Sequence, residues 1–324
     1  MNKSTGSALR GTFIANSSAY AGAAVSNKFS YSSNGISWTA SNAQNTELDY
    51  DGHGAWSPQL GIMVMTGFDN SPYGGNTTAS CWSSTDGISW TQRITPSWGS
   101  EGSVCWSTTL GKFLAVAQAM TSCIESTNGT TWTTRTASGL SGLRDVTWSS
   151  SLGLFLSAGY AGGVYTSPTG QTWSKSTVSG SSGSGAGLGI CWDDSINRGV
   201  CVFYNGTWNR ISYSSNGTSW TASTTATARN YYKVCYSPSL AMFVAVAAGA
   251  GTSAISTSVD NGVNWTTQTC PNKNVSGIAW GAELGLFVAT SWDSILTSPD
   301  GVVWTARTNA GAINTFGVFY VPGL

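Results

Sequence analysis

A short turn motif that recurs seven times constrains the fold of this chain more than any other feature. In each copy a glycine stands three residues before a tryptophan, and a polar or acidic residue stands one or two residues before the glycine. The tryptophans are 39 to 52 residues apart, close to the period of one four-stranded blade of a β-propeller. The polar residues are Asn34, Asp86, Asn128, Thr169, Asn216, Asp260 and Asp300, and the tryptophans are Trp38, Trp90, Trp132, Trp173, Trp220, Trp265 and Trp304. We therefore predict an all-β fold, a seven-bladed β-propeller.

Each repeat unit predicts four short strands, which we call a, b, c and d. In the unit around Trp173 these are residues 145–149, 155–158, 163–166 and 171–177. The runs are β-branched and aromatic, glycine, serine and asparagine separate them, and no segment keeps a helical spacing of apolar residues. A hairpin of the type Trp-Ser-x-x-Leu-Gly joins strands a and b in most units.

The seventh unit is divided between the two ends of the chain. Residues 316–324 supply strand a and its turn, and residues 9–41 supply strands b, c and d. Pairing of the termini in one blade removes the exposed sheet edges that an open array would leave. We therefore expect residues 1–324 to form a single, closed propeller domain.

The composition excludes several classes of function. Only 9% of the residues are charged, with 14 basic and 14 acidic side chains, so no net field favours nucleic acid. The start of the chain lacks an apolar signal segment, and no run of apolar residues is long enough to span a membrane. The seven cysteines form no CxxC pair, and we expect small, buried thiols rather than disulfides or a zinc site. We predict no cofactor, no nucleic-acid partner and no membrane insertion.

The alternation of strands separates the loops into two faces. The a–b and c–d turns, which we call the turn face, repeat with little change. The b–c and d–a loops, which we call the loop face, carry nearly all of the variation in length, so binding is expected there. An exposed aromatic ring on that face offers an apolar surface to a sugar. The candidate ligand-binding residues are Trp98, Trp208, Trp292, Tyr73, Tyr160 and Tyr231.

One acidic segment is a candidate for a cation site or an acid–base pair. Residues 47–54, predicted as a d–a loop, contain Asp49, Asp51 and the only histidine, His53. Asp49 and Asp51 are the candidate cation ligands. A single loop without ligands from elsewhere is more typical of a solvated acidic loop, and His53 is interpreted as a surface or turn histidine. We therefore predict no metal site.

The turn motif resembles the Asp-box (BNR) repeat of the sialidase-like β-propellers. Residues 258–265, Ser-Val-Asp-Asn-Gly-Val-Asn-Trp, match it fully. The resemblance implies that the boxes are structural and lie far from any catalytic centre. A sialidase of that family also needs three convergent arginines, whereas Arg93, Arg135 and Arg307 occupy equivalent places in strand d, the outermost strand. Arg210 and Ile211 begin an Arg-Ile-Pro signature, but Ser212 replaces its proline.

The whole unit is also similar to repeat proteins that bacteriophages and other large viruses encode as virion components. This resemblance implies a non-catalytic binding module on the virion surface, such as a tail-fibre appendage, made in the host cytoplasm without a signal peptide. We expect it to recognise a cell-surface glycan for host attachment. One alternative is a structural or decoration subunit that binds other virion proteins, which a broad apolar patch on one face would favour. A second is a glycoside hydrolase, which needs two carboxylates about 5–10 Å apart in a central cleft.

Overall fold

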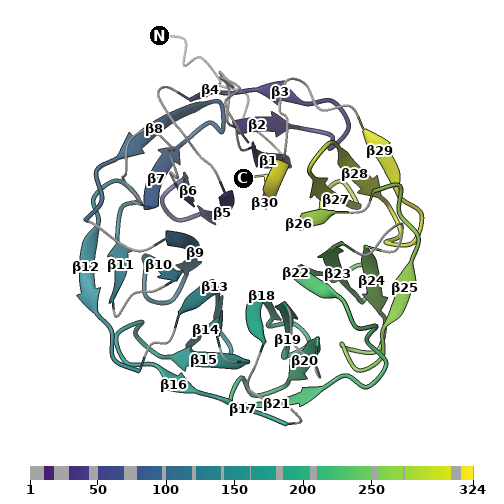
Figure 1. The fold of residues 1–324 in the computed structure, drawn as a ribbon. Helices are drawn as coiled ribbons and strands as arrows, with labels where there is room; N and C mark the ends of the chain where they lie inside the picture. Colours follow the sequence, from purple (N-terminus) through teal and green to yellow (C-terminus); the bar gives the residue numbers. More distant parts are fainter. Residues whose placement is uncertain are drawn as a thin grey trace.

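The computed structural model describes residues 11–17, 29–43, 50–68, 79–96, 100–118, 122–139, 142–160, 162–179, 185–204, 210–249, 254–272, 274–307 and 315–323. Every element in these ranges is a β-strand. The strands form seven sheets arranged as a ring around a central axis (Figure 1). The predicted seven-bladed β-propeller is confirmed. None of the described residues belongs to a helix that could span a membrane.

The blades are numbered here from the one that contains both termini, and their strands are given in the order a, b, c, d. Blade 1 is β30 (Thr315–Val321), β1 (Thr12–Ser17), β2 (Phe29–Ser32) and β3 (Thr39–Ala40); blade 2 is β5 (Tyr50–Ser57), β6 (Ile62–Phe68), β7 (Ala79–Ser84) and β8 (Ser89–Arg93). Blade 3 is β9 (Ser100–Ser107), β10 (Lys112–Gln118), β11 (Ser122–Ser126) and β12 (Thr133–Thr136); blade 4 is β13 (Leu143–Ser149), β14 (Leu154–Gly159), β15 (Gly163–Ser167) and β16 (Ser174–Lys175). Blade 5 is β18 (Ala186–Asp193), β19 (Arg198–Tyr204), β20 (Ile211–Ser214) and β21 (Ser219–Ala222); blade 6 is β22 (Asn230–Ser237), β23 (Met242–Ala248), β24 (Ile255–Ser258) and β25 (Thr266–Gln268); blade 7 is β26 (Val275–Gly281), β27 (Leu286–Ser291), β28 (Ile295–Ser298) and β29 (Thr305–Arg307).

The two ends of the chain close the ring as predicted. β30 is the innermost strand of blade 1 and pairs antiparallel with β1, which places Phe13 opposite Tyr320 and Ile14 opposite Phe319. Figure 1 shows β30 and β1 side by side, with the C-terminus close to the axis. The last strand of the chain is thereby covered on both sides, by β1 within its blade and by the inner strands of the neighbouring blades.

The outer edges of the blades are partly covered by chain that leaves strand d. β4 (Asn42–Ala43) pairs parallel with β8, and β17 (Thr177–Val178) pairs parallel with β21. The prediction of one strand d over residues 171–177 is therefore wrong: only β16 pairs within blade 4, and the chain then crosses to blade 5. Continuing onto the next blade gives partners to the backbone groups of an edge strand.

The hydrophobic core lies between the blades rather than at the axis. The buried side chains form seven clusters among the described residues, and each cluster combines residues of two neighbouring blades. The tryptophans of the seven boxes are all buried there. Because every blade contributes to two clusters, no blade keeps its apolar surface buried without both neighbours.

The box turns have the geometry that their residue types predict. In blade 2, Oδ1 of Asp86 accepts hydrogen bonds from the amides of Ile88 (2.8 Å) and Ser89 (2.7 Å). The indole Nε1 of Trp90 donates to the carbonyl of Gly87 at 3.1 Å, and equivalent bonds occur in five other boxes. Burial opposes ionisation of Asp86, but the donors of the turn outweigh it and lower the pKa of this carboxyl group.

The box glycine also sets the distance between blades. Gly217 has a φ of 73°, a left-handed conformation that costs other residues about 1–2 kcal/mol. A Cβ atom at Gly217 would lie 2.9 Å from Cδ2 of Leu156, in strand b of blade 4. The a–b turn glycine Gly111 has a similar φ of 60°, but a Cβ there would meet nothing within 4 Å.

We predict that Gly217→Ala destabilises the fold by about 1–3 kcal/mol more than Gly111→Ala, because only the first substitution crowds a buried leucine side chain of the neighbouring blade. Both variants carry the same backbone strain, so their difference isolates the contact between blades. Denaturant unfolding monitored by tryptophan fluorescence measures it. If both variants lose the same free energy of unfolding, the box glycine is needed only for the backbone conformation of its own turn.

Candidate functional site

The inner strand of every blade contains a register shift near the loop face. The shifts fall at equivalent places, for example between Tyr50 and His53 in β5, between Leu143 and Asp145 in β13, and between Tyr231 and Lys233 in β22. The other four inner strands show the same irregularity. A bulge redirects the side chains beside it. These seven bulges therefore decide which residues of the inner strands face the axis.

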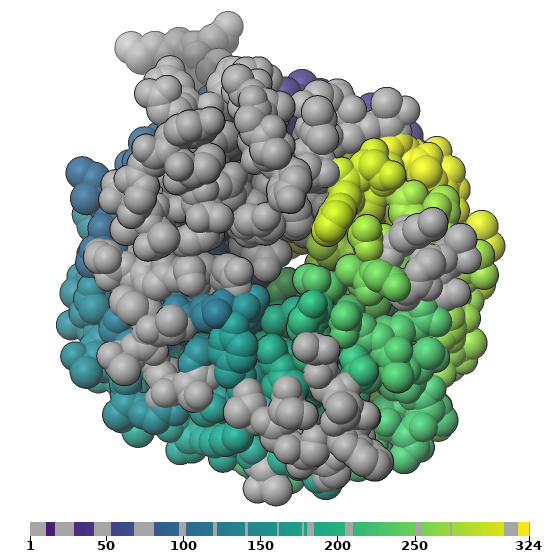
Figure 2. Space-filling model, viewed as in Figure 1, coloured from purple at the N-terminus to yellow at the C-terminus, as the bar shows by residue number. Residues whose placement is uncertain are grey.

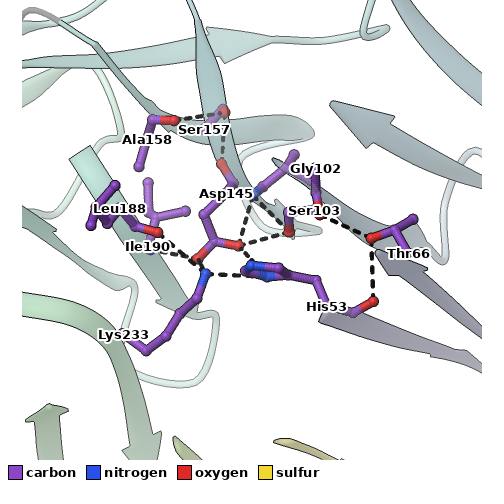
Figure 3. Close-up of polar contacts among 11 residues, drawn as sticks. His53, Thr66, Gly102, Ser103, Asp145, Ser157, Ala158, Leu188, Ile190 and Lys233 are labelled. Atoms are coloured by element: carbon purple, nitrogen blue, oxygen red, sulfur yellow. Dashed lines mark hydrogen bonds and ion pairs between the residues drawn. The ribbon is translucent and has the colours of Figure 1, made fainter. Parts of the chain in front are cut away.

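One equivalent position stands three residues before the aromatic residue of strand a, directly after the bulge in six strands and one residue further along in β9. Around the ring it is occupied by His53, Ser103, Asp145, Gly189, Lys233, Gly277 and Gly317. The four residues with side chains meet at one point (Figure 3). We call these four residues the axial cluster. Gly189 is required because a Cβ there would lie 2.6 Å from the carbonyl oxygen of Tyr232 in the next blade.

Asp145 is the centre of the axial cluster. Its Oδ1 accepts from the Ser103 hydroxyl (2.7 Å) and the Val146 amide (3.1 Å), and it lies 3.2 Å from Nδ1 of His53. Its Oδ2 accepts from the Ile190 amide (3.0 Å) and lies 3.1 Å from Nζ of Lys233. A carboxylate offers about four lone-pair positions, so the acceptor capacity of Asp145 is fully used.

Lys233 and His53 complete the contacts from blades 6 and 2. Nζ of Lys233 has three acceptors within reach: Oδ2 of Asp145, the carbonyl of Leu188 (3.2 Å) and Nδ1 of His53 (3.1 Å). Nδ1 of His53 either donates to Asp145 or accepts from Lys233, because one ring nitrogen cannot do both. Thr66 of β6 holds the His53 strand in place by donating to the carbonyls of His53 and Gly102.

The cluster keeps Asp145 ionised. The residue is buried, with 10% of its side chain exposed, and desolvation alone would raise its pKa. The Lys233 ammonium, His53 and the Ile190 amide outweigh this effect and hold the pKa of Asp145 well below its usual range. With all its lone pairs occupied and its pKa depressed, Asp145 is suited to holding blades together and unsuited to donating a proton.

Other reactive groups are not assembled in the described part of the chain. No three metal-ligating side chains come together there. The cysteines are free and do not form a disulfide among the described residues, and burial raises the pKa of the Cys123 thiol to about 11 and that of Cys191 to about 12. The thiols are therefore protonated near neutral pH and act as small apolar groups.

On the loop face, Trp292 is placed as predicted. It lies in the b–c turn of blade 7, and 51% of its surface is exposed. Asn272, from the preceding d–a connection, donates to Oγ of Ser291 (2.8 Å), Oδ1 of Asp293 (3.0 Å) and Oγ of Ser294. Among the described residues, the second carboxylate oxygen of Asp293 has no partner. An exposed indole thus stands beside a fixed group that accepts hydrogen bonds.

The tyrosine candidates have different outcomes. Tyr160 is half-buried, and its hydroxyl accepts from Nη2 of Arg144 at 2.6 Å while the guanidinium lies 5.1 Å from the ring centre. Tyr231 is fully buried between blades 5 and 6 and bonds Ser256 at 2.8 Å, so its predicted ligand contact is wrong. The bulge in β22 turns Tyr231 inward and leaves the half-buried Tyr232 stacked edge-on against Tyr204. Candidates Trp98, Trp208, Tyr73 and Asp49 lie outside the described residues, and for Asp51 only the backbone, in β5, is described.

The repeat-equivalent arginines lie where the sequence predicts. Arg93, Arg135 and Arg307 are in the outer strands β8, β12 and β29, and each Nε donates to the neighbouring strand c. They do not converge on the axis (Figure 1). Arg210, at the start of strand c of blade 5, instead donates to the carbonyl of Arg229 and to Asn230.

The sequence prediction for His53 is wrong. Residues 50–57 form strand β5 rather than a loop, and the imidazole is 14% exposed within the axial cluster. No local motif indicates the axial cluster, because its members are at least 42 residues apart along the chain. Aligning the repeats on the strand a aromatic shows a column in which His53, Ser103, Asp145 and Lys233 occupy four positions and glycines occupy the other three. This column is the sequence signal from which the axial cluster could have been predicted.

Fold and axial cluster together define the protein as a seven-bladed β-propeller with a polar centre. No family model and no curated protein matches the chain. Among solved structures it is similar to the periplasmic gluconolactonase of Pseudomonas aeruginosa, with a TM-score of 0.63 and 7% identity over 97% of this chain and 99% of that one. It is also similar to a chain of the nidogen/laminin complex, with a TM-score of 0.54 and 10% identity over 96% and 97% of the two chains. At such identities the likeness shows the fold alone.

We predict that Asp145→Asn lowers the free energy of unfolding at neutral pH by about 3–5 kcal/mol, because it leaves the Lys233 ammonium poorly compensated. Since the folded pKa of Asp145 is lowered, its contribution is complete above the unfolded value of about 3.9 and is lost as pH falls through the folded value. The difference in the free energy of unfolding between Asp145→Asn and the parent protein should therefore become smaller in acid. Urea unfolding from neutral to acidic pH measures it.

Asp260→Asn is the matched control for this experiment. Asp260 is an exposed box residue, and asparagine occupies the same place in three other boxes. This variant should unfold within about 0.5 kcal/mol of the parent protein. An equal loss in Asp145→Asn and Asp260→Asn would contradict a central position for Asp145.

Proposed function

We propose that this protein is a non-catalytic propeller of the Asp-box type that binds a cell-surface glycan through its loop face. The observation that carries the proposal is the Trp292 turn. A half-exposed indole provides the flat apolar surface on which a sugar ring packs, and the free oxygen of Asp293 accepts a hydroxyl. The Asn272 contacts fix this turn before any ligand arrives, which reduces the entropy lost on binding.

The axial cluster supports a binding module rather than a glycoside hydrolase. A hydrolase requires one carboxyl group that donates a proton and a second that acts as base or nucleophile. Asp145 is the one carboxylate of the axial cluster, and its lowered pKa and occupied lone pairs suit neither task. The activity of the structurally similar gluconolactonase is not carried over to this chain, because the shared property is the fold.

We further propose that the module is a component of a virion, displayed on the particle surface. The proposal rests on the resemblance of the whole repeat unit to virion repeat proteins. The low content of charged residues and the many serine, threonine, asparagine and glycine residues suit an exposed particle component. In this proposal the loop face points away from the particle and meets the host cell.

A second candidate function, a structural subunit that binds other virion proteins, is favoured by one specific observation. Exposed aliphatic side chains gather on the turn face, mainly in the a–b hairpins and boxes. They are Ile36, Leu60, Leu110, Leu240, Val259, Leu284, Val302 and Val303, with exposures of 37 to 70%. Single exposed aliphatic residues are ordinary, but their repetition around one face suits a protein contact. The two functions are compatible, since they use opposite faces.

A glycan array probed with the purified protein tests the main proposal. We predict selective binding, weakened about tenfold or more by Trp292→Ala, which corresponds to ~1.4 kcal/mol. Ile94→Ala is the matched control, because it also removes an exposed apolar side chain: Ile94 is 96% exposed and directly follows strand d of blade 2. The control variant should bind like the parent protein.

Two outcomes would contradict the proposal. A blank array for the parent protein would remove the glycan function and favour the structural subunit. Binding that survives Trp292→Ala but is lost in a turn-face variant such as Leu110→Ser would place recognition on the wrong face.

A further inference from the structure

The hydrogen-bonding capacity of the axial cluster is used unevenly. Asp145 has no lone pair to spare, and the Ser103 hydroxyl donates to Asp145 and lies 3.4 Å from the Val146 amide. His53 differs, because its Nε2 has no partner among the described residues. If Nδ1 of His53 donates to Asp145, one N–H of Lys233 also loses its acceptor. With the ring proton on Nε2, the unused donor is the Nε2–H; with a neutral ring that donates from Nδ1, Nε2 is an acceptor and the unused donor is an N–H of Lys233. Each arrangement therefore leaves one N–H donor of the cluster unused.

The same two residues are the most accessible of the charged or titratable members. Side-chain exposure is 21% for Lys233 and 14% for His53, against 10% for Asp145. The positions next to them around the ring, Gly277 beside Lys233 and Gly317 beside His53, carry no side chain. The space-filling view shows a hollow at the axis, bordered on one side by green and yellow-green side chains, the colours of the last third of the chain (Figure 2).

The charge of the cluster depends on His53. With a neutral imidazole, the Asp145 carboxylate and the Lys233 ammonium cancel. A proton on His53 makes Nδ1 a donor to Asp145, gives the cluster a net charge of about +1 and leaves His53 and Lys233 each with an N–H to offer. A neighbouring anion would stabilise that charged state, since opposite charges a few ångströms apart favour ionisation.

We infer that the axial cluster is a binding site for a carboxylate, and that His53 takes up one proton from solvent when the carboxylate binds beside Lys233. The carboxylate oxygens accept from Nζ of Lys233 and from the imidazolium, while Asp145 keeps its bond to Nδ1. The ligand is either a small free acid or an acidic sugar, because both present the same group. This inference does not depend on the proposed glycan site around Trp292.

The described side chains around His53 include few other titratable groups. Among the described side chains, the charged groups that face it are Asp145 from β13 and Lys233 from β22. β9 contributes Ser103, β6 contributes Thr66, and β30 packs on this strand through Phe319. None of the last three titrates near neutral pH.

The only histidine in the sequence gives a single, unambiguous NMR reporter. We predict that sodium acetate shifts the pH titration of the His53 ring to higher pH relative to sodium chloride at the same ionic strength. Calorimetry in two buffers of different ionisation enthalpy should show net uptake of protons when acetate binds. Affinity then rises as pH falls, by at most about tenfold per pH unit for one linked proton. Methyl glucuronoside distinguishes the two kinds of carboxylate ligand. Tighter binding than acetate indicates an acidic sugar, and binding equal to that of acetate indicates a small free acid.

His53→Gln and Lys175→Met are the informative variants. Glutamine keeps an amide in the cluster but does not titrate, so proton uptake should vanish in His53→Gln. Lys175 lies in the outer strand β16, and its removal should leave acetate binding unchanged. An identical His53 titration in acetate and chloride would overturn the inference with the parent protein alone, whether or not the variants fold. Undiminished proton uptake in His53→Gln would overturn it as well.

Discussion

The buried carboxylate of Asp145 is the contact on which the ring of blades converges. Each blade is a small sheet that buries its faces only against its neighbours, so the ring gains its stability from closure. Asp145 adds links across the axis, to Ser103 in blade 3, Ile190 in blade 5 and Lys233 in blade 6. A buried ion pair contributes less to net stability than its Coulomb energy suggests. Its clearest effect here is to favour one arrangement of five inner strands over the alternatives.

The turn face and the loop face of the propeller differ in what their residues do. On the turn face, boxes and a–b hairpins satisfy their own backbone and fill the space between blades, and they leave little freedom for variation. On the loop face, the connections between strands differ in length from blade to blade. Trp292 illustrates the consequence, because its turn is anchored by Asn272 from another blade while the indole stays in solvent. A rigid ring with one variable face suits recognition.

The features that could be predicted from the sequence are those that depend on residues close together along the chain. The box turns, the buried box tryptophans and the closure by β30 and β1 were predictable, because each depends on short patterns repeated in register. Strand d of blade 4 was predicted too long, since the crossing of β17 to β21 depends on the neighbouring blade. Tyr231 and His53 were misplaced for one reason: both were assigned to d–a loops, whereas the inner strands β22 and β5 begin before them and include them in the packed ring. The axial cluster was recoverable only by comparing the same column across all repeats.

Native-state hydrogen exchange of the Val146 and Ile190 amides tests most directly whether the cluster at Asp145 unites the ring. Both amides bond the Asp145 carboxylate, and they belong to different blades. If the ring is one cooperative unit, both exchange only through global unfolding, with the same free energy and the same dependence on denaturant. Exchange of either amide through local opening at a markedly lower free energy would contradict the account, because the two blades would then separate at Asp145 while the rest of the ring stays folded.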